Sequence, residues 1–266
     1  MLKERVITAL ISVPIIVITV WFDEPLPWFT LLMVVWGALA AFEFYRIRGV
    51  TRVLPFACFG IIWAVLFILS PHFDFTFLVP LLLSSAVVLS LLLLVFYPEK
   101  EGAFQNWAGT VAGILYVGWL LSFLVALRLD AGRNWLLLAL FVTFASDTAA
   151  FFVGRALGKR RLAPRISPRK TWEGAVGGVF GAMLVSLLFV LPSPLQLPLG
   201  YGQALLLGLL VSVFGQLGDL AESLLKRSSG VKESGSFMPG HGGLLDRMDS
   251  VVFAGIVVYY FFLFSQ

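Results

Sequence analysis

The chain of 266 residues is too apolar and too poor in charge to be a soluble domain. Hydrophobic residues make up 59% of it and charged residues only 13%, whereas a soluble domain is about half apolar and a quarter charged. The formal net charge is only +4, and the single cysteine, Cys58, lies in an apolar run, so the chain has no internal disulfide framework.

About nine segments are long and apolar enough to cross a membrane, which takes roughly 20 mainly apolar residues. In chain order they are Val6–Phe22, Leu26–Phe44, Val53–Ser70, Phe75–Phe96, Trp107–Leu127, Trp135–Val153, Trp172–Leu191, Gln203–Leu225 and Val251–Phe264. The first segment resembles a secretion signal, but no A-x-A cleavage pattern follows it, so we expect an uncleaved helix. We therefore predict an all-α fold, a polytopic integral membrane protein that forms a single membrane domain over residues 1–266.

The basic residues gather on one side of the predicted membrane. If the crossings number nine, the N-terminus shares a side with the loops after the second, fourth, sixth and eighth segments. Of the 19 Lys and Arg residues, all except Arg128 and Arg133 fall on that side. Because positively charged loops stay in the cytoplasm, we predict that this side faces the cytoplasm from the cell (inner) membrane.

Residues suited to chemistry are concentrated after residue 130. We expect residues 1–130 to form ordinary membrane helices and residues 131–266 to carry the catalytic helices and cytoplasmic loops. The loop after the sixth segment is basic from Arg155 to Lys170, and its run Ser167–Thr171 ends where a helix begins. Helix N-termini favour phosphate, so this loop is predicted to bind phosphate. The alternative is an ordinary positive loop that attracts anionic lipids.

The eighth segment places acidic and basic side chains on one helical face. Asp219, Glu222, Ser223 and Lys226 recur at i, i+3, i+4 and i+7. A carboxylate inside a membrane span costs about 2.5–3.5 kcal/mol, so it is expected to face a partner or a wet cavity. For Glu222 the alternative is an i,i+4 ion pair with Lys226. Asp219 has no basic residue within one helical turn.

A second pair of carboxylates, Asp246 and Asp249, stands where the ninth segment begins. Two such pairs suit Mg²⁺, which takes one or two carboxylates and completes its shell with water and phosphate. Alternatively, these aspartates are helix-start charges favoured by the helix dipole. The preceding run Gly240–Gly243 lets backbone N–H groups approach an anion, and we expect His241 within it to contact phosphate or support the loop rather than bind metal.

Several other chemistries are excluded. The sequence has neither a P-loop nor a dinucleotide-binding glycine motif, and its cysteine and histidine residues are too few for zinc. Metal-assisted phosphoryl or nucleotidyl transfer at the membrane surface remains.

Together these runs resemble the phosphatidate cytidylyltransferases, also called CDP-diacylglycerol synthases. The matching residues are Asp147, Gly154-Arg155, Gly158-Lys159, Ser167-Pro168-Arg169-Lys170-Thr171-Trp172-Glu173-Gly174, Gly218-Asp219, Glu222-Ser223-Leu224-Leu225-Lys226-Arg227, Lys232 and Gly240-His241-Gly242-Gly243-Leu244-Leu245-Asp246-Arg247-Met248-Asp249. The chain departs from the family pattern at Glu233, where the family usually has Asp, and at Arg169, where it more often has Lys.

The resemblance implies the reaction of CTP with phosphatidic acid to give CDP-diacylglycerol and pyrophosphate, with Mg²⁺ as cofactor and the need for a second cation left open. It also suggests a homodimer in the lipid bilayer, with no nucleic acid as partner. We assign metal binding to Asp219 and Asp246, with Asp249 and Glu222 as second choices. The residues expected to bind substrate phosphates or support the leaving pyrophosphate are Lys226, Arg227, His241, Ser167, Arg169, Lys170, Thr171, Lys232, Gly242, Gly243 and Lys159.

Two competing functions stay open. One is a CTP-dependent lipid or polyprenol kinase. The other is a transporter of an anionic solute, which the clustering of charge at one membrane face and the lack of repeat symmetry disfavour.

Overall fold

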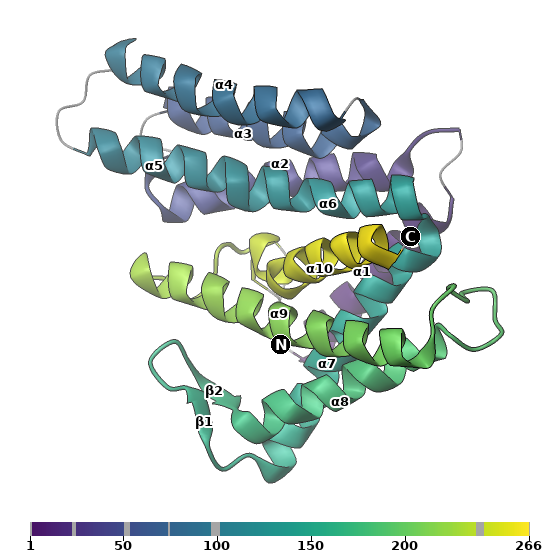
Figure 1. Cartoon of the computed structure of the whole chain (residues 1–266). Coiled ribbons are helices and arrows are strands. Elements are labelled where there is room, and N and C mark those ends of the chain that lie inside the picture. Colours follow the sequence, from purple (N-terminus) through teal and green to yellow (C-terminus); the bar gives the residue numbers. More distant parts are fainter. Residues whose placement is uncertain are drawn as a thin grey trace. The chain divides into compact units, whose positions relative to one another are not determined.

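The computed structural model describes the main helical segments of the chain and the loops that carry most of its charge. Its described residues are 2–22, 25–50, 54–73, 75–96, 102–237 and 242–265. The chain forms two compact units: the first comprises residues 1–129 and 233–246, and the second comprises residues 130–232 and 247–266 (Figure 1). The loop 233–246, which the sequence groups with the catalytic half, thus belongs to the unit of the N-terminal helices.

The first unit is a bundle of apolar helices. They are α1 (Leu2–Trp21), α2 (Trp28–Ile47), α3 (Leu54–Leu69) with the 3₁₀ helix η2 (Ser70–His72), α4 (Phe75–Phe96), α5 (Ala103–Gly113), η3 (Ile114–Trp119), α6 (Leu120–Ala126) and η4 (Leu127–Ala131). The last four run on as one helical segment, in which η3 and η4 are π-helical. Helix α3 packs against α2, α4 and α5 (Figure 1). The buried Tyr45 of α2 donates a hydrogen bond to the carbonyl of Thr110 at 3.0 Å.

The second unit contains four helices and a short hairpin. Its elements are α7 (Arg133–Leu157), β1 (Arg161–Ala163), β2 (Ser167–Thr171), α8 (Trp172–Leu188), α9 (Tyr201–Ser228) and α10 (Asp249–Ser265). The 3₁₀ helix η5 (Leu245–Arg247) begins in the first unit and ends at the first residue of the segment 247–266 of the second. Helix α7 packs along α8 and also touches α9 and α10 (Figure 1).

Helices α7 and α8 approach each other closely along a stripe of small residues. A Cβ atom added at Gly174 would lie 2.8 Å from the carbonyl oxygen of Ala150, and one added at Gly181 would lie 2.6 Å from the Cβ atom of Ala149. Small residues let helix backbones come close together in membranes, where burial of apolar surface does not drive helices together. The glycines of this stripe are therefore required by packing.

The loop after α7 forms a small antiparallel hairpin, where the sequence predicts no strand. Its register pairs Arg161 with Thr171 and Ala163 with Ser167. The fold is therefore helical with one short hairpin, and this hairpin carries the run predicted to bind phosphate.

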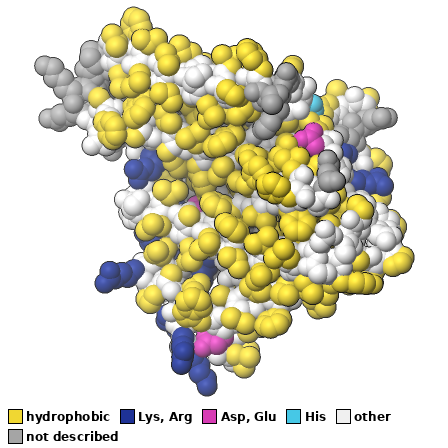
Figure 2. All heavy atoms as spheres, viewed as in Figure 1, with side chains coloured by type: hydrophobic (Ala, Val, Ile, Leu, Met, Phe, Trp, Pro, Cys, Tyr) yellow, Lys and Arg dark blue, Asp and Glu magenta, His cyan; other side chains and the backbone are white. Residues whose placement is uncertain are grey.

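The helices and the surface identify a membrane protein. In the described part of the chain, six helices are long and apolar enough to span a membrane: Trp28–Ile47, Leu54–His72, Phe77–Phe96, Ala103–Ala131, Arg133–Leu157 and Tyr201–Ser228. Three shorter apolar helices, Ser12–Trp21, Trp172–Leu188 and Asp249–Ser265, coincide with the first, seventh and ninth predicted segments. Hydrophobic side chains cover most of the face shown in Figure 2. The number of nine crossings stays a prediction.

Candidate active site

An ion pair between Asp219 of α9 and Lys170 of β2 lies in the charged region of the second unit. The Lys170 Nζ atom is 2.5 Å from Asp219 Oδ2, and the side chains of Lys170 and Asp219 are only 24% and 31% exposed, respectively. The Ser223 hydroxyl, one turn further along α9, donates to Asp219 Oδ1 at 3.3 Å. The structure thus brings together a carboxylate predicted to bind metal and an ammonium group predicted to bind phosphate.

Two further carboxylates act on Asp219 electrostatically. Asp147 of α7 and Asp249, the first residue of α10, are both repelled by its negative charge. Lys170 attracts Asp147, and Lys226 attracts Asp249. Three helices of this unit therefore bring carboxylates and cations into one region.

Asp147 is missing from the residues predicted to bind metal, although it belongs to the matching motif. Its signal in the sequence is that it is the only acidic residue in the apolar helix α7. A carboxylate within a membrane segment is costly and therefore points to function. That criterion, applied to each segment separately, selects Asp147 alongside Asp219.

Glu222 and Lys226 form the ion pair that the i,i+4 spacing allows. Glu222 is fully buried, and its Oε1 atom lies 3.0 Å from Lys226 Nζ. A buried carboxylate needs such a partner, because an unpaired charge out of water is strongly destabilising. The Glu222 carboxylate is thereby paired with a lysine of its own helix. Asp147 and Asp249 are therefore the better candidates to bind a cation together with Asp219.

The hairpin is held to the start of α8 by side-chain to backbone hydrogen bonds. The hydroxyl of Thr171, the N-cap residue of α8, accepts from the Gly174 amide at 3.1 Å. The Glu173 carboxylate accepts from the amides of Lys159 at 3.1 Å and Arg160 at 3.2 Å. Thr171 and Glu173 therefore shape this basic loop before any ligand binds.

The other cations predicted to bind phosphate lie at the surface. Four of them are exposed: Lys159 and Arg169 of the hairpin region, Arg227 in the last turn of α9 and Lys232 after it. Ser167 is half-buried. Some of the Lys and Arg side chains of the molecule are visible in Figure 2 as isolated blue groups on the apolar surface.

Asp246 lies in the first unit and is held by backbone amides of its own loop. It is 7% exposed and accepts from the amides of Ser234 at 3.0 Å and Gly243 at 2.8 Å. A Cβ atom at Gly242, where φ is +84°, would lie 2.6 Å from Asp246 Oδ2. The Gly243 amide, predicted to face pyrophosphate, thus binds a carboxylate of the chain. His241 lies outside the described residues.

Glu43 of α2 is a buried carboxylate that the sequence did not single out. The second segment is expected to be an ordinary membrane helix, yet Glu43 is 4% exposed and accepts hydrogen bonds from Ser234 and Leu245. The sequence does contain a sign of its importance, because Glu43 is the only acidic residue in the apolar helix α2 and a carboxylate in a membrane segment is costly.

The carboxylates of the second unit suit Mg²⁺ by their chemistry. In the part of the chain that the structure describes, no three Asp, Glu, His or Cys side chains converge to form a metal cage. Mg²⁺ does not need one, because it takes one or two carboxylates and completes its shell with water and substrate phosphate. Asp219 with Asp147 or Asp249 is a donor set of that kind.

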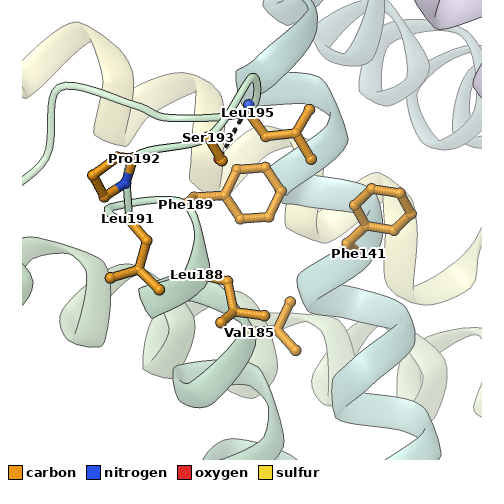
Figure 3. Close-up of a pocket in the computed structure, with 8 residues that line it drawn as sticks. All are labelled: Phe141, Val185, Leu188, Phe189, Leu191, Pro192, Ser193 and Leu195. Carbon is orange, nitrogen blue, oxygen red and sulfur yellow. Dashed lines mark hydrogen bonds between the residues drawn. The ribbon is translucent and has the colours of Figure 1, made fainter.

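An apolar pocket of about 560 Å³ lies at the other end of α8 (Figure 3). It is lined by Phe141, Val185, Leu188, Phe189, Leu191, Pro192, Ser193 and Leu195. The lining has no charged group, and the hairpin joins α8 at its opposite end. This pocket is therefore not the site of a reaction between phosphates.

Comparison with known proteins gives full-length matches. Residues 3–265 match the cytidylyltransferase family. The chain is 35% identical to a phosphatidate cytidylyltransferase of Bacillus subtilis (strain 168) over 264 residues, 97% of each chain. It is 36% identical to one of Brucella suis biovar 1 (strain 1330) over 271 residues, 98% of this chain and 93% of the other. Because the match runs from the first helix to the last and includes the charged segments described above, the chain belongs to the cytidylyltransferase family.

Proposed function

We propose that this protein is a membrane-bound nucleotidyltransferase that makes CDP-diacylglycerol and pyrophosphate from CTP and phosphatidic acid. The observation that carries the proposal is the similarity to phosphatidate cytidylyltransferases over almost the whole chain. The second unit supports it, because carboxylates suited to a cation lie beside lysines suited to phosphate.

The lipid phosphate needs no general base to act as a nucleophile. Phosphate monoesters have a second pKa near 6, so phosphatidic acid is largely a dianion at neutral pH. One of its oxygens attacks the α-phosphorus of CTP. The bond from that phosphorus to the oxygen bridging to the β-phosphate breaks, and pyrophosphate leaves with the electron pair. The barrier is mainly repulsion between two anions, which fixed positive charges lower.

The residues of the second unit supply these charges. Lys170 and Lys226 would hold and orient the phosphates. Arg169 and Arg227 are exposed at the surface and would also bind them. Mg²⁺, held by Asp219 with Asp147 or Asp249, would contribute positive charge at the reacting phosphates. The polar headgroup of phosphatidic acid would enter from the membrane surface while its acyl chains stay in the bilayer.

The product distribution tests the proposed function. CTP labelled at the α-phosphate or at the γ-phosphate is incubated with purified protein, phosphatidic acid and Mg²⁺. We expect the α-label in the lipid and the γ-label in pyrophosphate. Transfer of the γ-label to lipid with formation of CDP would show that the protein is a kinase instead. The absence of any CTP turnover would favour the remaining alternative, a transporter of an anionic solute.

We also propose that the active site faces the cytoplasm and that the chain crosses the membrane about nine times. Helix α8, with 17 residues, is about 25 Å long at roughly 1.5 Å per residue, close to the ~30 Å of a hydrocarbon core.

Cysteine labelling tests this topology. In a Cys58→Ser background, we expect Arg161→Cys and Ser228→Cys to react with an impermeant reagent only from the cytoplasmic side. Pro194→Cys is expected to react only from outside, because it lies at the other end of α8. The opposite pattern would place the active site on the outer face.

A further inference from the structure

The buried carboxylate of Glu43 has more partners than packing in a membrane helix requires. Its Oε2 atom accepts a hydrogen bond from the Ser234 hydroxyl at 3.1 Å and another from the Leu245 amide at 2.9 Å. A charge buried to this degree persists only where such partners compensate for the loss of water. Glu43 therefore ties two points of the loop 233–246 to α2 within the first unit.

Both points that Glu43 holds are next to Asp246, one through a hydrogen bond and the other along the chain. Ser234 bonds both carboxylates, because its hydroxyl donates to Glu43 and its amide donates to Asp246. Leu245, whose amide donates to Glu43, directly precedes Asp246. A displacement of Glu43 would thus shift Asp246 through both Ser234 and Leu245.

Other contacts bring the loop close to α2. Arg46, one turn after Glu43, donates to the Ser234 carbonyl at 2.9 Å, and the Trp36 indole donates to the Leu244 carbonyl at 3.2 Å. At Gly235 and Gly243 the loop backbone comes so near the Glu43 carboxylate that a side chain would collide with it. The loop is therefore fitted around this carboxylate.

We propose that Glu43 is a positioning residue that fixes the place of Asp246 and thereby sets the rate of cytidylyl transfer. The inference rests on the proposed function and on the assignment of Asp246 to metal binding from the sequence, because it requires Asp246 to take part in the reaction. The effect of Glu43 is transmitted through Ser234 and Leu245, and a displacement of a reacting group by about 1 Å is enough to cost up to about 10²-fold in rate.

The test compares Glu43→Gln with Tyr45→Phe. Glutamine keeps the size of the side chain but loses its charge and one acceptor oxygen. Tyr45→Phe removes another buried hydrogen bond from α2, the one to Thr110, and leaves the loop contacts intact. Amide hydrogen exchange of the segment 233–247 is measured in metal-free protein, and kcat and KM for CTP are measured with Mg²⁺.

We expect Glu43→Gln to speed exchange in this segment about tenfold and to lower kcat by about 10–100-fold, with KM for CTP changed much less. Tyr45→Phe should alter neither the exchange of the segment nor kcat, even where it lowers thermal stability. If Glu43→Gln does not accumulate in the membrane, Ser234→Ala replaces it, since it removes only the hydroxyl that donates to Glu43, and kcat is expected to fall about tenfold.

Faster exchange with an unchanged kcat would overturn the inference, since Glu43 would then only anchor the loop. Unchanged exchange would overturn it as well. An inactive wild-type protein would instead refute the proposed function, so the two failures are distinguishable.

Discussion

Asp219→Asn lowers the turnover of CDP-diacylglycerol synthesis by about 10²–10³-fold, the loss seen when one key electrostatic contact of an active site is removed. Asparagine keeps the size of the side chain but removes its negative charge. Lys170, which pairs with Asp219, then loses its partner, and the proposed cation site loses its central carboxylate. The measurement is the rate of pyrophosphate release at saturating CTP, phosphatidic acid and Mg²⁺.

Asp130→Asn is the matched control for this variant. Asp130 also lies in the second unit and accepts a hydrogen bond from Tyr259 at 2.9 Å, but it has no part in the proposed site. We expect its turnover to stay within about twofold of wild type, because Asp130 has no role in the proposed site and asparagine still offers Tyr259 an acceptor oxygen. An equal loss in both variants would mean that Asp219→Asn acts through folding, and a normal rate in Asp219→Asn would contradict its assignment to the cation.

Asp246→Asn is expected to reduce turnover by a similar factor of about 10²–10³. Its carboxylate is held by the amides of Ser234 and Gly243, and asparagine can accept only through its single oxygen. The variant therefore loses both the negative charge of the side chain and part of the hydrogen bonding that fixes its position. Glu233→Gln is the control, since Glu233 is an exposed carboxylate of the same loop, and a smaller loss is expected there.

Full activity of Asp246→Asn at saturating Mg²⁺, with normal protein levels, would leave Asp246 as a residue that only shapes its loop. Asp147 and Asp249 would then be the carboxylates to examine next. The prediction from sequence that Asp219 and Asp246 bind the same cation has its own test. In that case the double variant loses much less than the product of the two single losses, because residues that share one task act as a unit.

The helices of this protein are predictable from sequence because the signal is local. An apolar run of sufficient length specifies a membrane helix wherever it occurs, and the predicted segment Phe75–Phe96 coincides with α4. The Glu222–Lys226 pair is also local, since both residues lie on one helical face. Spacing along the chain was enough to propose it.

The partners of Asp219 and Glu43 are not predictable in that way. Lys170 reaches Asp219 from a hairpin that forms in a different segment, and the partners of Glu43 lie 191 and 202 positions further along the chain. No periodicity encodes such pairings, which depend on the packing of whole helices. The sequence does show that a lone carboxylate in an apolar segment needs a partner; it does not show which partner.

The small-residue stripe between α7 and α8 also determines how the protein can be engineered for heat tolerance. Replacing glycine by alanine usually stabilises a helix by about 0.4–1 kcal/mol, because it restricts the unfolded chain. At Gly174 and Gly181 the added methyl group would meet the facing helix, so the same replacement would force α7 and α8 apart. Gly202 in α9 has open space around it, and thermostabilising substitutions belong there.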